Sequence, residues 1–293
     1  MFKGSNVALI TPFKNNKLDV DNYIELIHFH IKNGTNGLVP AGTTGESPTL
    51  THEEHKKIIS LCVDLANKRI PVIAGTGSNS TEEAISLTKY AKQVGADGAL
   101  IVTPYYNKPT QQGLFEHFKA INDNCDIPII IYNIPGRSVV DMNVDTMYRL
   151  SELPNIVGVK DATNDLTRPL LTLDRCGQDF CQLSGEDGTV VPFLSQGGHG
   201  CISVTANIAP RKCADLHNAW QKKDLKKVQE INLYLSPLNQ ALFAETSPAP
   251  TKYAASLLNI CLEDCRLPLS QVSGETKKLI KKTLHDLKIY SNK

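Results

Sequence analysis

The sequence predicts an α/β protein, a (β/α)8 or TIM barrel followed by a small helical domain. Short apolar runs alternate with amphipathic helical patterns eight times, and this alternation favours a barrel over a doubly wound sheet. The first apolar run ends in Thr-Pro-Phe, and the chain contains neither a GxGxxG motif nor a P-loop, so a dinucleotide-binding fold is disfavoured. Because no strand pattern follows residue 222, we expect a catalytic barrel at 1–222 and a helical domain at 223–293.

The eight expected strands are short, apolar on both faces and bounded by turn residues, as in a parallel sheet covered by helices. They are residues 7–11, 37–41, 71–74, 98–102, 128–132, 156–160, 180–184 and 200–204. The expected helices have the amphipathic period, and two of them begin with a hydroxyl cap before Glu, at 51–54 and 80–83. These helices are residues 19–32, 51–67, 81–93, 111–122, 144–150, 166–175, 188–195, 210–221, 224–243, 250–258 and 274–289.

Charge and hydropathy exclude several classes of function. The 31 basic and 30 acidic residues leave a formal net charge of +1, so no broad field is available to bind nucleic acid or an anionic membrane. No apolar run is long enough to span a bilayer. The first residues lack the charged, apolar and cleavage regions of a secretion signal.

The cysteine pattern predicts a cytoplasmic protein without a structural metal. None of the cysteines forms a CxxC pair, and no His/Cys cluster has the spacing of zinc ligands. Dispersed cysteines in a chain of this length are typical of reduced, mostly buried thiols. The eight cysteines are Cys62, Cys125, Cys176, Cys181, Cys201, Cys213, Cys261 and Cys265.

Polar side chains cluster where the expected strands end, and in a barrel these ends share the face that carries the active site. The ends contribute hydroxyls, phenols, one lysine and one arginine, without a histidine or a metal-type carboxylate cluster. Lys160 ends the apolar run 156–160. Taken alone, this stretch favours a lysine whose ammonium simply reaches solvent. Likewise, each tyrosine, threonine and arginine alone fits an ordinary aromatic, a helix cap or a solvated loop residue.

Together these groups favour a lysine-dependent lyase. In a dry cavity poor in carboxylates, we expect the pKa of a lysine to fall from its usual value of about 10.4. A neutral amine can then attack a carbonyl and form a Schiff base. Neighbouring phenols and hydroxyls can relay the protons that this reaction moves, and the Gly-Thr-Thr-Gly turn at 42–45 can present N–H groups to a carboxylate.

Several motifs carry a resemblance that extends along the whole chain. The chain resembles the pyruvate-dependent class I aldolase superfamily of dihydrodipicolinate synthase and N-acetylneuraminate lyase. The motifs are Gly-Thr-Thr-Gly-Glu-Ser at 42–47, Tyr-Tyr-Asn at 105–107, Ile-Tyr-Asn at 131–133, Gly-Val-Lys-Asp at 158–161, Gly-Gly-His-Gly-Cys-Ile-Ser-Val at 197–204 and Phe-Ala-Glu-Thr-Ser-Pro-Ala-Pro at 243–250.

The resemblance implies a role for each residue at the strand ends. Lys160 would form an imine with pyruvate, and no cofactor would be needed because the imine is the electron sink. Tyr132 would be the general acid/base, with Thr43 and Tyr106 completing a proton relay. Tyr106 would reach in from a neighbouring subunit, so the resemblance implies at least a dimer, within a homotetramer built as a dimer of dimers. The pocket-lining residues would be Thr44 for the pyruvate carboxylate, Gly185 and Ile202.

Arg137 indicates the second substrate within this superfamily. A planar guanidinium suits a carboxylate, and the synthases use an arginine here to bind L-aspartate 4-semialdehyde on the route to diaminopimelate and lysine. The alternatives are a lyase for a sugar acid or sialic acid, and a catalytically silent binding paralogue. Three positions depart from the family pattern. Ser138-Val139 replaces the usual Thr-Gly, and Ser247 replaces an Asn, which we expect to affect packing rather than chemistry.

The resemblance also implies a second site, at which L-lysine would inhibit the enzyme. On a helix, histidines three residues apart share a face, and a glutamate nearby could hold an amino group. The alternative is a capped, solvated helix turn. The six matching residues are Ser47, His52, His55, Asn79, Glu83 and Tyr105.

Overall fold

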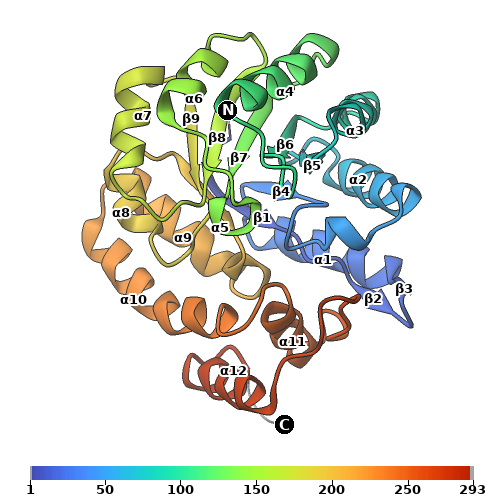
Figure 1. Ribbon diagram of the computed structural model, residues 1–293. Helices are drawn as coiled ribbons and strands as arrows, with labels where there is room; N and C mark the ends of the chain where they lie inside the picture. Colours follow the sequence, from blue (N-terminus) through green and yellow to red (C-terminus); the bar gives the residue numbers. More distant parts are fainter. Residues whose placement is uncertain (1, 291–293) are drawn as a thin grey trace.

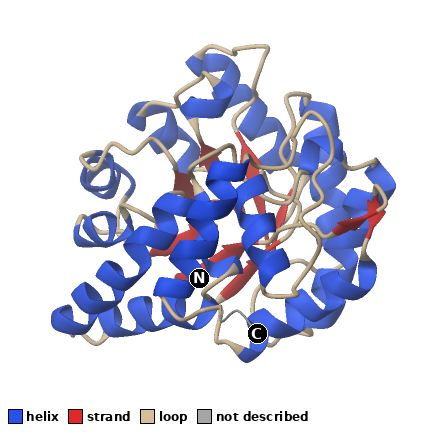
Figure 2. Ribbon diagram, turned by 90° about the horizontal axis from the view of Figure 1, so that it is seen from below, coloured by secondary structure: helices blue, strands red, loops and turns tan. Residues whose placement is uncertain are grey.

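The structure is a computed structural model that describes residues 2–290. Eight parallel strands form a central barrel, and helices surround it (Figures 1 and 2). In sequence the barrel strands are β1 (Gly4–Ala8), β4 (Gly37–Val39), β5 (Ile73–Gly75), β6 (Gly98–Val102), β7 (Ile129–Asn133), β8 (Ile156–Asp161), β9 (Cys181–Ser184) and β10 (Gly200–Ser203). Their order in the sheet is β4-β1-β10-β9-β8-β7-β6-β5.

The barrel closes between the two ends of this sheet, β4 and β5. The N–H of Leu38 donates to the carbonyl of Pro71, and the N–H of Gly75 donates to the carbonyl of Pro40, both at 2.9 Å. Closure leaves no free sheet edge. The predicted (β/α)8 barrel is therefore confirmed.

Helices cover the outside of the barrel, and further helices follow it. In chain order they are α1 (Val20–Lys32), α2 (His52–Ala66), α3 (Thr81–Gln93), α4 (Gln111–Asn124), α5 (Pro135–Ser138), α6 (Val144–Ser151), α7 (Arg168–Cys176), α8 (Val190–Ser195), α9 (Pro210–Gln221), α10 (Leu225–Leu242), α11 (Ala249–Leu257) and α12 (Gly274–Asp286). Figure 1 shows α11 and α12 at the end of the molecule opposite α4. The division at residue 222 stays a prediction, and residues 291–293 of the expected second domain lie outside the described part of the chain.

The first strand was placed too late in the sequence: it spans Gly4–Ala8 rather than 7–11. The apolar pattern began at residue 7, but two polar residues before it are buried in the sheet. The N–H of Ser5 donates to the side chain of Asn36 at 2.8 Å, and the side chain of Asn6 donates to the carbonyl of Cys201 at 3.3 Å. These bonds satisfy the N–H of Ser5 and the side-chain N–H of Asn6, which would otherwise be costly to bury, whereas the side-chain oxygens of both residues have no partner in the described part of the chain.

Short elements inside the loops were also missed. They are the hairpin β2 (Phe13–Lys14) and β3 (Lys17–Leu18), the 3-10 helices η1 (Ser47–Thr49) and η2 (Thr205–Asn207), and the four-residue helix α5. Elements of this length have too few residues to show a period. The predicted helix caps are confirmed: Thr51 forms a capping box with Glu54 at the start of α2, and Ser80 accepts from the N–H of Glu83 at the start of α3.

The apolar core has two layers, and this fixes which side chains face the barrel interior. The inner layer includes Ile130, Tyr132 and Ile202. Val159 and Ile131 belong to the larger outer layer between strands and helices. Because successive side chains of a strand point to opposite faces, Lys160 and Tyr132 both point inward.

Within residues 2–290, no helix is long and apolar enough to cross a membrane. All eight cysteines are free thiols.

Candidate active site

Lys160 and Tyr132 lie side by side at the ends of β8 and β7, where the two residues pair in register. The Nζ atom of Lys160 lies 4.1 Å from the centre of the Tyr132 ring. Both side chains are buried, and Lys160 is only 5% exposed. Within residues 2–290, its Nζ atom makes no hydrogen bond and no ion pair, an uncommon state for a buried lysine. The amine is thus available to a ligand.

The ends of β8, β9 and β10 are tied together around Lys160. The N–H of Gly185 donates to the carbonyl of Asp161 at 2.6 Å. A Cβ atom on Gly185 would lie 2.6 Å from the Cβ of Ala162, so this close approach requires glycine. Next to it, the buried carboxylate of Asp187 accepts from the hydroxyl of Ser203 and from the N–H of Val204 at 2.8 Å. The predicted pocket residues Gly185 and Ile202 are therefore held on adjacent strand ends.

The turn after β4 presents Thr43 and Thr44. Its shape comes from backbone bonds, in which Gly45 donates to the carbonyl of Gly42 and Glu46 to that of Thr43, both at 3.1 Å. The Thr11 hydroxyl holds the turn by donating to the carbonyl of Gly45 at 2.7 Å. In the described part of the chain, the N–H groups of Thr43 and Thr44 have no acceptor. Two adjacent free N–H groups can bind a carboxylate.

Arg137 reaches the same region from α5. A cavity of about 230 Å³ is lined by Thr43, Arg137, Ser138 and Tyr105, among others. Arg137 is an exposed residue, and its guanidinium donates to the carbonyl of Ser247 at 3.4 Å. The sequence led us to expect that Ser247 affects packing only. Its backbone carbonyl also contacts Arg137, the residue that we expect to bind substrate.

The loop after Arg137 is strained at Val139, where the family pattern has glycine. Val139 adopts φ 65° and ψ −21°, a left-handed conformation that is unfavourable for a β-branched residue. Its neighbour Ser138 is buried and holds the loop through bonds to the carbonyls of Ile134 and Val140 at 2.9 and 3.0 Å. The loop thus keeps its shape without glycine, at a cost in strain.

Replacing Val139 with glycine is expected to stabilise the protein by about 1 kcal/mol. A left-handed non-glycine residue destabilises the folded state by roughly 1–3 kcal/mol, and glycine removes this strain. Against this gain, the greater flexibility of glycine in the unfolded chain costs about 0.5–1 kcal/mol. Little packing is lost, because the Val139 side chain is 67% exposed. Urea denaturation measures the change. Val139→Ala is the matched control, because it keeps the positive φ without glycine's freedom. Equal midpoints for the two variants would contradict the strain.

Tyr106 does not join the site of its own chain. Its side chain is 90% exposed and its φ is 72°, so the loop turns the phenol away from the barrel. Its neighbour Tyr105 is half-buried, and the carbonyl of Tyr105 accepts from the side chain of Asn79 at 3.1 Å. Adjacent tyrosines therefore have opposite orientations: one lines the cavity near Arg137 and the other projects outward.

The six residues of the expected lysine site lie together. A second cavity of about 180 Å³ is lined by five of them, and the sixth, Asn79, is bonded to Tyr105. Glu83 contacts His52 at 2.8 Å, and the side chain of Ser78 also donates to it, which lowers the pKa of Glu83. Burial lowers the pKa of His55. The five lining residues are Ser47, His52, His55, Glu83 and Tyr105.

This arrangement gives the second cavity one anionic carboxylate and a neutral imidazole, which suit a ligand with an amino group. Ser47, Gly77 and Tyr105 line both cavities. The two cavities therefore share a wall.

One group near Lys160 was missed in the sequence. Burial raises the pKa of Glu186, and the positive charge of Lys160 opposes that shift. The strand ends around Lys160 therefore include a half-buried carboxyl group, which the prediction of a cavity poor in carboxylates did not consider. Glu186 follows Gly185 directly, and its position at a strand end was the available signal.

Comparison with known proteins places the chain among enzymes. The model of the dihydrodipicolinate synthetase family matches residues 1–287. A 4-hydroxy-tetrahydrodipicolinate synthase of Rhodospirillum centenum is 61% identical over 284 residues, which cover 97% of this chain and 98% of that protein.

Solved structures that are similar to this chain are also dihydrodipicolinate synthases. The crystal structure of dihydrodipicolinate synthase from Aquifex aeolicus superposes with a TM-score of 0.97 at 48% identity, covering all of both chains. The enzyme from Acinetobacter baumannii, complexed with pyruvate, gives 0.96 at 44% identity, with coverage of 99% of this chain and 100% of that one. The enzyme from Cyanidioschyzon merolae with lysine bound gives 0.94 at 35% identity, with coverage of 98% and 99%.

Proposed function

The chain belongs to the dihydrodipicolinate synthetase family, and we propose that it condenses pyruvate with L-aspartate 4-semialdehyde, the reaction of a 4-hydroxy-tetrahydrodipicolinate synthase. Membership makes it an enzyme, a class I aldolase-type lyase. The observation that carries the proposal is the buried amine of Lys160, which pairs with no group in residues 2–290 and lies beside the Tyr132 ring. A relative of known structure holds pyruvate.

In the proposed reaction, Lys160 Nζ attacks the keto carbon of pyruvate, and loss of water leaves an imine. Tyr132 moves the protons that this addition and dehydration require, with the Thr43 hydroxyl in the relay. The free N–H groups of the turn and the Thr44 side chain hold the pyruvate carboxylate. The imine loses a methyl proton to become an enamine, whose carbon bonds to the aldehyde carbon of the semialdehyde while the aldehyde oxygen takes up a proton. The amino group of the semialdehyde then attacks the re-formed imine carbon, which closes the ring and expels the Lys160 amine. Arg137 holds the carboxylate of that second substrate.

A neighbouring subunit completes this site in our proposal. The Tyr106 phenol is 90% exposed and lies outside the site of its own chain, and Tyr106 of a second copy would supply the missing relay member. We propose a homotetramer built as a dimer of dimers, located in the cytoplasm. Light scattering gives the mass of the assembly.

Trapping with borohydride tests the proposal. Incubating the protein with pyruvate and borohydride should give a covalent adduct on Lys160, located by peptide mass spectrometry. The absence of an adduct would overturn the proposed chemistry and leave a binding paralogue. Adding aspartate semialdehyde, a sugar acid or a sialic acid in separate reactions then identifies the second substrate. We expect turnover with the semialdehyde, and turnover only with a sugar acid or sialic acid would overturn the assignment of Arg137.

We further propose that L-lysine binds in the second cavity and slows the enzyme. Its anionic Glu83 and its wall shared with the first cavity support this, as does the relative with lysine bound. Through Tyr105, a ligand there would contact a residue that also lines the cavity near Arg137.

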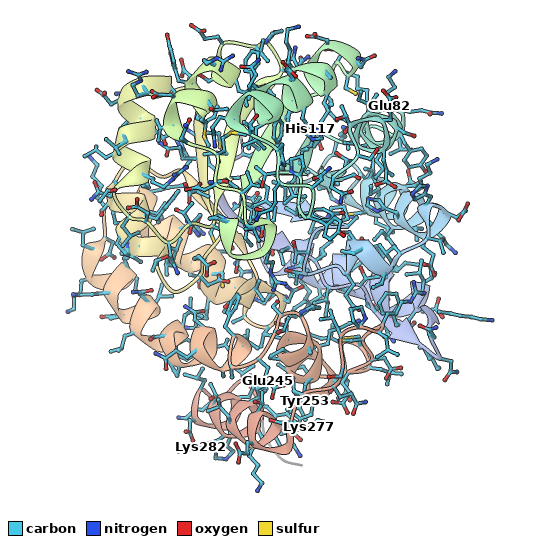
Figure 3. All side chains as sticks on the ribbon, in the orientation of Figure 1. Glu82, His117, Glu245, Tyr253, Lys277 and Lys282 are labelled. Carbon is cyan, nitrogen blue, oxygen red and sulfur yellow. The ribbon has the colours of Figure 1, made fainter. Side chains whose placement is uncertain are left out.

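Replacing Glu83 with glutamine is expected to raise the half-inhibiting lysine concentration at least about tenfold, because glutamine keeps an acceptor oxygen but loses the negative charge that strengthens a hydrogen bond from an ammonium group. Initial rates over a series of lysine concentrations give this value. Glu82→Gln is the matched control, since Glu82 directly precedes Glu83 on α3, is exposed and projects from the helix surface (Figure 3). Similar half-inhibiting concentrations for both variants would place the inhibitor elsewhere.

A further inference from the structure

A second buried lysine lies near the active site, and unlike Lys160 it is fully paired. The side chains of Lys252, on α11, and Glu46, in the turn after β4, are both 0% exposed, and Lys252 Nζ lies 2.5 Å from Glu46 Oε1. The two residues are 206 positions apart in sequence. Removing two charges from water is costly, and an apolar pair of similar size is often at least as stable. A fully buried ion pair therefore calls for an explanation other than stability.

Further bonds fix the geometry of this pair. Lys252 Nζ also donates to the carbonyl of Asp264 at 2.5 Å and lies 4.2 Å from the centre of the Phe13 ring. The second oxygen of Glu46 accepts from the N–H of Arg266 at 2.9 Å. Glu46 thus joins two separate points of the C-terminal region to one turn.

Arg266 extends the connection to the start of α2. Its guanidinium donates to both oxygens of Glu54, each at 2.6 Å, and to the carbonyl of Thr49 at 2.9 Å. The segment from Glu46 to Glu54 is therefore fixed to the C-terminal region along its length. The Thr43–Thr44 turn lies directly before this segment.

We infer that Glu46 and Lys252 are positioning residues that hold the Thr43–Thr44 turn in the shape that binds the pyruvate carboxylate. The inference rests on the proposed function. Glu46 has a left-handed backbone, φ 56°, and its N–H closes the turn onto the carbonyl of Thr43 at 3.1 Å. A backbone in that conformation persists only when its surroundings enforce it, and the buried pair supplies that constraint. The C-terminal helical region would thereby contribute to substrate binding without touching substrate.

Three full-length variants separate positioning from stability: Lys252→Met, the double variant Glu46→Gln/Lys252→Met, and the control Lys277→Met. Lys252→Met leaves Glu46 charged and buried without its partner, so its melting temperature should fall. The double variant removes that charge but keeps an acceptor for Arg266, so its melting temperature should recover. Lys277 pairs with Glu263 at 2.8 Å and lies over the Tyr253 ring, where α12 meets α11 (Figure 3). The control therefore loses an ion pair in the same region but away from the turn.

The Michaelis constants decide between the two roles. For the double variant we expect the KM for pyruvate to rise at least about tenfold, because a small misplacement of binding groups is costly, while the KM for the semialdehyde stays within about twofold. Hydrogen–deuterium exchange of residues 42–50 should increase in the same variant. A double variant with a recovered melting temperature, an unchanged pyruvate KM and unchanged exchange would overturn the inference.

The exchange measurement also keeps this inference distinct from the proposed reaction. A wild-type protein that traps no pyruvate would overturn the reaction and, with it, the role in pyruvate binding. Unchanged exchange in the double variant would overturn the positioning of the turn whatever the chain catalyses.

Discussion

Replacing Lys160 with methionine is expected to lower the rate of condensation by a factor on the order of 10⁴ or more, without loss of the fold. Methionine keeps the length of the side chain but has no amine to form the imine. Because Lys160 Nζ has no ion-pair partner within residues 2–290, its removal breaks no direct ion pair, and Glu186 loses only the attraction that opposes the rise in its pKa. The melting temperature should therefore stay the same or rise, as is common when an active-site group is removed. Initial rates and thermal denaturation measure the two effects.

The same substitution at Lys252 should have the opposite thermal effect, which makes the two buried lysines controls for each other. Lys160→Arg is a further control. It keeps the positive charge, but a guanidinium remains protonated and does not form the imine. We expect this variant to be as inactive as Lys160→Met. If Lys160→Arg retained a substantial part of the rate, Lys160 would act through its charge alone, and the covalent mechanism would be wrong.

The sequence identified the barrel because its signals are local. Each strand is an apolar run, and the residues that follow each run reach the same face of the barrel in any regular (β/α)8 fold. Lys160 and Tyr132 could therefore be placed together before their register was known. The site residues predicted from strand ends depended on that geometry and not on contacts between particular atoms.

Partners far apart in the chain were not predictable in the same way. The pattern placed Lys252 in a C-terminal helix, but nothing near it in sequence indicated Glu46 as its partner. The buried Asn6 shows the same limit, because its partner Cys201 lies on the neighbouring strand β10 but 195 positions away in sequence. Tyr106 shows a second limit. Its outward direction depends on a left-handed backbone conformation, which cannot be predicted from a tyrosine in the sequence.

Acidification from pH 6.5 to pH 5 is expected to destabilise the protein by at least roughly 3 kcal/mol per pH unit, because three buried histidines strongly resist protonation. His55 and His199, whose pKa values burial also lowers, add to this effect. Burial lowers the pKa of His30 to about 3, and that of His117 and His217 to about 4, from 6.5. Below pH 6.5 the unfolded chain binds protons at these positions and the folded chain does not. The unfolded state thus binds more protons, so the free energy of unfolding falls as the pH falls, until the folded pKa values are reached.

His30 allows this origin to be tested on one helix. Its Nδ1 lies 3.0 Å from the Thr35 hydroxyl, and its buried Nε2 has no partner in the described part of the chain. Urea denaturation at several pH values should show that His30→Gln lowers the slope by about 1 kcal/mol per pH unit, one third of the total or less. His28→Gln, on the exposed face of α1, should leave the slope unchanged. The window lies above the usual pKa values of Asp and Glu, so carboxylates contribute little there. An equal slope in both variants would mean that acid destabilises the protein through other groups.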